Sequence, residues 1–166
     1  MPHPPHDILV TDTNDEAMVA TVSAEGLADK IDRGEEFNLL DTRPAESYSS
    51  WHIPGAVNVP YSPDETLEPE SVADMAVGEE VLLICAEGIS SLSVAEELEA
   101  LGYTDVTVVE GGMAAWSEVY ETVSIPTTDD RVEIVQVQRR AKGCLGYVIG
   151  SSTTDAAAAI DVTRHS

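Results

Sequence analysis

The chain has 166 residues, of which 31 are acidic and 8 are basic, so its formal net charge is −23 at pH 7. A balance this acidic repels nucleic acid and anionic membranes, and we expect neither as a partner. No apolar stretch is long enough to cross a membrane, and the start, M-P-H-P-P-H-D, lacks the features of a secretory signal. Two cysteines are too few for a disulfide framework, which favours a cytoplasmic location.

The charge is unevenly divided. Residues 1–120 hold 25 acidic and 3 basic side chains, net −22, whereas residues 121–166 hold 6 and 5, net −1. Molar salt shortens the Debye length to about 3 Å and removes most of the resulting repulsion. We therefore hypothesise a halophilic protein. The break in charge also predicts a linker at S-I-P-T-T-D-D-R, residues 124–131, with a second unit following it.

The pattern along residues 1–80 alternates short apolar runs with helical segments. We predict a flexible leader over 1–17, a strand over 18–22, and a helix capped by Ser23 with Leu27 and Ile31 on one side. Strands follow at 37–41 and 56–60, with a loop and short helix between them. Residues 62–80 are predicted to form a loop and an acidic helix.

The run V-L-L-I-C, residues 81–85, has no polar alternation and predicts a strand buried on both faces, as in a parallel sheet under helices. The next helix should present one apolar stripe and stop at Gly102; the stripe comprises Leu92, Val94, Ala95, Leu98 and Leu101. A strand at 106–109 and a short M-A-A-W helix complete the alternation, which predicts a three-layer α/β domain. Ligands of such sheets bind at the carboxyl ends of the strands, where Cys85 lies.

Three blocks in this order resemble the rhodanese family: L-L-D-T-R-P-A-E-S-Y-S-S-W-H-I-P-G-A-V-N-V-P, V-L-L-I-C-A-E-G-I-S-S and G-Y-T-D-V-T-V-V-E-G-G-M-A-A-W. The resemblance covers about residues 18–120, and we set the domain at 18–124. It implies a central five-stranded parallel sheet with helices on both faces. It also implies sulfurtransferase chemistry through Cys85, without a metal or cofactor.

The residues after Cys85 suit that chemistry. The loop comprises Ala86, Glu87, Gly88, Ile89, Ser90 and Ser91, whose small members allow several backbone N–H groups to face a thiolate. The alternative is a cysteine that simply fills the core. Many rhodanese loops that handle thiosulfate carry a basic residue, whereas Glu87 should repel that dianion, so we favour a persulfide or protein-borne donor. Ser91 occupies the position at which a phosphatase C-x5-R loop needs arginine, which argues against phosphatase activity.

Other polar residues are interpreted as structural. Asp41 and Arg43 should form an ion pair that supports the loop. His52 has no second ligand at metal-binding spacing and should be hydrogen-bonded, and Trp51 and Trp116 should pack in the core or on helices. His3 and His6 form no defensible site.

Residues 125–166 predict a β-strand extension of two or three strands with a turn at S-S-T-T-D. Q-R-R-A-K-G-C-L-G-Y-V-I-G and A-I-D-V-T-R resemble the opening strands of metallo-β-lactamase-fold hydrolases, but no H-x-H-x-D-H follows before Ser166. We therefore expect no metallohydrolase activity from this chain. Cys144 is interpreted as a strand residue, with a resolving thiol as the alternative. These strands should pack on the α/β domain, self-associate or bind a partner metallohydrolase.

The leading interpretation is a sulfurtransferase that moves a sulfane sulfur from thiosulfate or a persulfide to a thiol or cyanide through a Cys85 persulfide. One alternative is a non-catalytic module that binds or delivers sulfur alongside a metallohydrolase partner. Another is a truncated fusion fragment with little role of its own.

Overall fold

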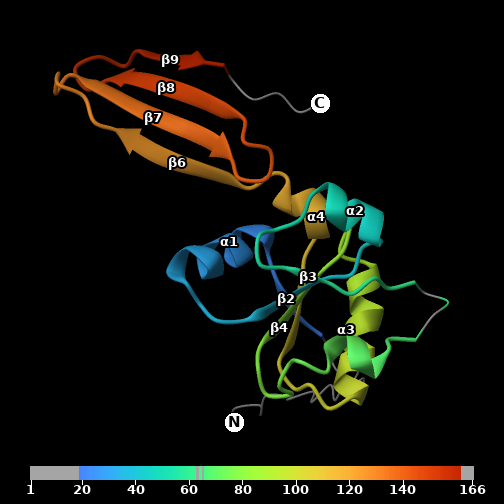
Figure 1. Cartoon of the computed structure of the whole chain (residues 1–166). Coiled ribbons are helices and arrows are strands. Elements are labelled where there is room, and N and C mark those ends of the chain that lie inside the picture. Colours follow the sequence, from blue (N-terminus) through green and yellow to red (C-terminus); the bar gives the residue numbers. More distant parts are fainter. Residues whose placement is uncertain (1–18, 63, 65, 162–166) are drawn as a thin grey trace, which may run out of the picture.

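The computed structural model describes residues 19–62, 64 and 66–161, so the predicted leader lies outside the described residues. It contains a five-stranded parallel sheet and a four-stranded antiparallel sheet (Figure 1). The α/β class, the five parallel strands and the C-terminal β extension are thus confirmed. No helix in the described part of the chain is long and apolar enough to span a membrane.

The parallel sheet has the strand order β1-β5-β4-β2-β3, which places β4 at its centre. Its strands are β1 (Ala20–Val22), β2 (Asn38–Asp41), β3 (Val57–Asn58), β4 (Val81–Ile84) and β5 (Val106–Val109). The connecting helices are α1 (Ala24–Arg33), α2 (Ala45–Ser50), α3 (Ser90–Ala100) and α4 (Gly112–Trp116), with a 3₁₀ turn, η1 (Pro69–Val72). The central position of β4 explains its lack of polar alternation, because both of its faces are covered.

Two hydrophobic cores lie on opposite faces of this sheet. On one face, Leu82 and Ile84 of β4 pack with residues of α1 and α4, including Leu27 and Trp116. On the other face, Val81 and Leu83 pack with α3 and η1. Successive β4 side chains therefore enter alternate cores, as the pleat of a strand requires.

The helix boundaries follow their local sequence signals. The Ser23 side chain accepts a hydrogen bond from Gly26 N at 3.1 Å at the start of α1, which ends at Gly34 with φ 67°. Gly102 follows α3 with φ 96°, as predicted for a stop. The stripe predicted on α3 is only partly correct, because Leu92 and Leu101 are exposed and Ser91 is buried instead.

The acidic helix predicted within residues 62–80 is wrong, because the described part of this segment forms only η1 and irregular turns. Pro69 begins the 3₁₀ turn, and its missing N–H suits a first turn more than a helix interior.

The antiparallel sheet has the order β6-β7-β8-β9, formed by β6 (Tyr120–Ile125), β7 (Val132–Arg139), β8 (Leu145–Ser151) and β9 (Ala157–Ile160). Strand β6 was not predicted, and the predicted domain boundary between residues 124 and 125 falls inside it. Most of the predicted linker is instead the hairpin turn between β6 and β7, which Thr127 closes by donating to the Val132 carbonyl at 2.9 Å. The turn predicted at S-S-T-T-D does connect β8 to β9. Cys144 is exposed and lies just before β8, so its interpretation as a strand residue is wrong.

Candidate active site

Cys85 lies immediately after β4, at the carboxyl end of the central strand. Only 3% of the residue is exposed, whereas Ala86 and Glu87, which follow it directly, are exposed. The sulfur therefore lies just beneath the surface of the loop, between the end of the sheet and the start of α3. This is the edge of a parallel α/β sheet at which ligands bind.

The loop turns back on the sulfur through Gly88. The Gly88 N–H donates to Cys85 Sγ at 3.0 Å. Gly88 has φ 84°, and a Cβ atom there would lie 2.9 Å from Gly111 N. A glycine is needed at this position both for the left-handed backbone and for the close approach of the next loop.

The start of α4, with the glycine pair Gly111 and Gly112, holds the loop from the other side. Met113 N donates to the Cys85 carbonyl at 2.8 Å, and Ala114 N donates to the Ala86 carbonyl at 3.0 Å. A Cβ atom on Gly112 would lie 2.8 Å from Gly88 N and closer still to the Cys85 oxygen. The E-G-G run lies in one of the sequence blocks that resemble the family, but its contact with the cysteine loop was not predicted. The two adjacent glycines before a predicted short helix were the signal that could have indicated it.

The groups around Cys85 favour a thiolate. Burial is the largest single influence and raises the pKa of Cys85, but hydrogen bonds from the Ser90 and Ser91 hydroxyls and from the Ser91 and Glu87 amides outweigh it and lower the pKa to about 7, from an ordinary 9.0. The start of α3 contributes in the same direction.

The outer surface of the loop carries an acidic and an apolar side chain. Glu87 is exposed, and 72% of Ile89 is exposed. The loop, residues 86–91, contains no basic side chain. The exposed surface of the loop therefore offers a carboxylate and an isoleucine, and no cation.

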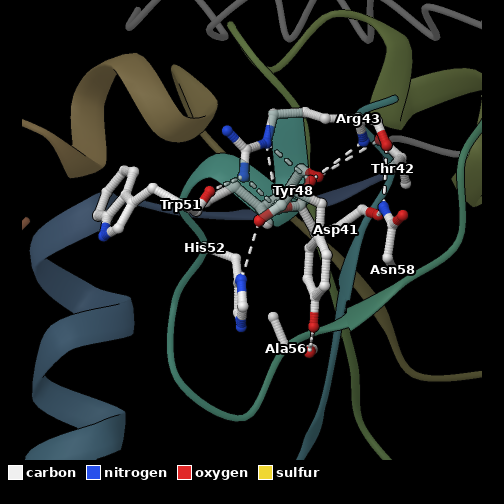
Figure 2. Close-up of polar contacts among 9 residues, drawn as sticks. Asp41, Thr42, Arg43, Tyr48, Trp51, His52, Ala56 and Asn58 are labelled. Carbon is white, nitrogen blue, oxygen red and sulfur yellow. Dashed lines mark hydrogen bonds and ion pairs between the residues drawn. The ribbon is translucent and has the colours of Figure 1, made fainter. Parts of the chain in front are cut away.

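Asp41 and Arg43 form an ion pair at the end of the neighbouring strand, β2 (Figure 2). Asp41 is fully buried, and Arg43 donates to it through Nε at 2.9 Å and Nη2 at 2.5 Å. Arg43 Nη2 also donates to the Trp51 carbonyl at 2.7 Å. Thr42 N, between the two, donates to the Ile84 carbonyl at 2.9 Å, so the pair lies beside the backbone that leads into Cys85.

His52 is held within the segment after α2 (Figure 2). Its Nδ1 lies 2.9 Å from the Tyr48 carbonyl, and the two rings stack with centroids 3.9 Å apart. Trp116 is buried, as expected, but Trp51 is 37% exposed and is not a core residue. His3 and His6 lie outside the described residues. Within residues 19–62, 64 and 66–161, no three His, Cys, Asp or Glu side chains are grouped so that they could hold a metal ion.

The amino-acid sequence of the chain also matches a known protein family. Residues 23–119 match the family model described as the rhodanese-like domain, and the chain belongs to that family. It is 33% identical over 98 residues to the putative sulfurtransferase YtwF of Bacillus subtilis, covering 59% of this chain and 90% of the relative. It is also 30% identical to the putative sulfur carrier protein YrkF of the same organism, covering 60% of this chain but only 51% of the relative.

The fold agrees with solved members of the family. A rhodanese-like domain protein from Staphylococcus aureus is 30% identical, with a TM-score of 0.52, and covers 59% of this chain and 91% of its own. Relatives named as sulfurtransferases support sulfur transfer at a general level. The family match ends at residue 119, immediately before β6.

Proposed function

We propose that the chain is a sulfurtransferase in which Cys85 is the nucleophile and residues 86–91 bind the sulfur. The observation that carries the proposal is the Gly88 N–H directed at Cys85 Sγ at 3.0 Å. A thiol with a pKa of about 7 is about half ionised at neutral pH, which gives a reactive thiolate without a metal.

In the proposed reaction, the Cys85 thiolate attacks the outer sulfur of a persulfide or of thiosulfate. A bond forms between the two sulfurs, and the donor's own S–S bond breaks, releasing a thiolate or sulfite. A thiol or cyanide acceptor then attacks the terminal sulfur of the Cys85 persulfide and restores the Cys85 thiolate. The backbone N–H groups of the loop stabilise the anionic sulfur in both steps.

We further propose a persulfide as the preferred donor. Glu87 is exposed on the loop, so its carboxylate repels dianionic thiosulfate more strongly than a monoanionic persulfide. Asp41 and Arg43 are proposed as structural support for the loop, because Arg43 joins the end of β2 to the Trp51 carbonyl, and Thr42, between the two, donates to the Ile84 carbonyl just before Cys85.

Steady-state kinetics with a low-molecular-weight persulfide and a thiol acceptor test these proposals. Parallel double-reciprocal plots are expected for a substituted-enzyme reaction, with turnover lost in Cys85→Ser and retained in Cys144→Ser. Glu87→Gln should raise kcat/KM for thiosulfate relative to the persulfide, whereas Glu99→Gln, at the far end of α3, should not. If neither donor supports turnover, the result would instead favour the non-catalytic module that binds or delivers sulfur. The resemblance of residues 125–166 to the opening strands of a metallohydrolase remains a prediction.

A further inference from the structure

Within the part of the chain that the structure describes, the C-terminal sheet has no hydrophobic core of its own. Neither of the two cores contains a residue of β6, β7, β8 or β9. All four residues of β9 are exposed. In Figure 1 the sheet extends away from the α/β unit, beyond the end of α4. An antiparallel sheet normally packs at least one face, so this sheet requires a covering surface.

The strand register shows which face needs covering. Side chains paired across strands share a face, and alternate residues along a strand lie on opposite faces. One face, here termed the apolar face, carries the following large or apolar side chains: Val123, Ile125, Val132, Ile134, Leu145, Tyr147, Ile149, Ala158 and Ile160. Val123 is 53% exposed and Ile160 is 50% exposed.

Charge is nearly absent from the apolar face. Its other members are Glu121, Gln136, Gln138 and Ser151, so Glu121 is the only charged residue. That residue lies at the end nearest α4, where it pairs with Arg140 at 2.8 Å. The opposite face is less apolar, because it carries Glu133, Arg139 and two glycines. A strongly charged partner therefore has nothing to pair with on the apolar face.

We propose that the apolar face is the interface of a two-fold homodimer, in which the sheets of two copies pack face to face. A two-fold interface needs only a patch that is complementary to itself, which an uncharged apolar sheet face provides. The charge distribution favours the same partner: residues 1–120 of each copy carry net −22, whereas residues 121–166 carry net −1. Association through the C-terminal sheet brings together the only nearly neutral part of two highly acidic chains.

The dimer does not depend on Cys85 and is separate from the proposed sulfur transfer. Its test is the mass of the full chain by sedimentation and light scattering in molar KCl, over a range of protein concentrations. The wild type and Cys85→Ser should both have twice the 17.7 kDa mass of one chain. Loss of turnover with the dimer intact would therefore count against the sulfurtransferase only.

Two double variants test which face of the C-terminal sheet forms the dimer interface. Val123→Glu with Ile160→Glu places two carboxylates on the apolar face, and the dissociation constant should rise at least about 100-fold. Thr122→Glu with Ala159→Glu adds the same charge at neighbouring positions of the same strands but on the opposite face, and should remain dimeric. Circular dichroism checks that both variants fold. The proposal would be overturned if both folded variants dissociated equally, or if the wild type were monomeric at every concentration. A wild type that is folded but monomeric would point to a different protein as the partner that covers the apolar face.

Discussion

Replacing Ser90 by alanine should slow the reaction of Cys85 with an alkylating agent at neutral pH. The hydroxyl of Ser90 is the largest of the influences that lower the pKa of Cys85 to about 7. A hydrogen bond to a charged group is worth about 1.5–3 kcal/mol, and about 1.4 kcal/mol corresponds to one pH unit. Loss of this hydroxyl should therefore raise the pKa by about one unit.

The magnitude at pH 7 follows from the thiolate fraction. A pKa of about 7 leaves about half of the Cys85 thiol ionised, and a rise of one unit leaves about a tenth. Alkylation by iodoacetamide at pH 7 should slow about fivefold, whereas the rate well above the raised pKa should not change. The reaction rate of both proteins rises with pH through the respective pKa, because the thiolate is the nucleophile.

The assay needs a Cys144→Ser background, because Cys144 is exposed and would also react. Ser93→Ala is the matched control, since Ser93 is exposed in the same first turn of α3 but is not among the groups that shift the pKa of Cys85. An unchanged pH–rate profile in Ser90→Ala, or a wild-type midpoint near 9, would contradict the proposed lowering of the Cys85 pKa by the groups around it.

Three further predictions concern the support of the site and the acidic surface. Gly112→Ala should lower the free energy of unfolding in urea by more than about 3 kcal/mol, because its Cβ meets the Cys85 loop, whereas Gly34→Ala, with a similar φ and open space, should cost about 1 kcal/mol. Arg43→Ala should lower the free energy of unfolding by about 3–5 kcal/mol because it leaves buried Asp41 unpaired, whereas Arg131→Ala, which breaks a similar but exposed pair with Asp129, should lower it far less; equal losses would contradict this reasoning. The melting temperature should rise between dilute and molar KCl as repulsion is screened, and a flat or falling melting temperature would argue against the halophilic hypothesis.

The sequence predicted the parallel sheet well because its signals are local. The unbroken V-L-L-I run implies burial on both faces, and Cys85 directly follows it, so the strand end and the thiol were located together. The D-x-R spacing similarly indicated the Asp41–Arg43 pair, because side chains two residues apart after a strand end are within reach of each other.

Features that depend on distant contacts were not predictable in the same way. The requirement for Gly112 arises from the Cys85 loop, 27 positions earlier in the chain, and only the folded arrangement brings them together. Strand β6 was missed because Thr122 and Ser124 interrupt its apolar residues and a proline follows it directly, which resembles a linker. Trp51 is 37% exposed although tryptophan usually packs, and its backbone carbonyl accepts a hydrogen bond from Arg43, which the side-chain type does not predict.

The most direct test of the central claim is the mass of the Cys144→Ser protein after incubation with a low-molecular-weight persulfide. Transfer through Cys85 predicts an adduct of about 32 Da, one sulfur atom, located on Cys85 by peptide mapping and removed by added thiol. A protein that gains no such mass, or gains it equally in a Cys85→Ser variant, would contradict sulfur transfer through this residue.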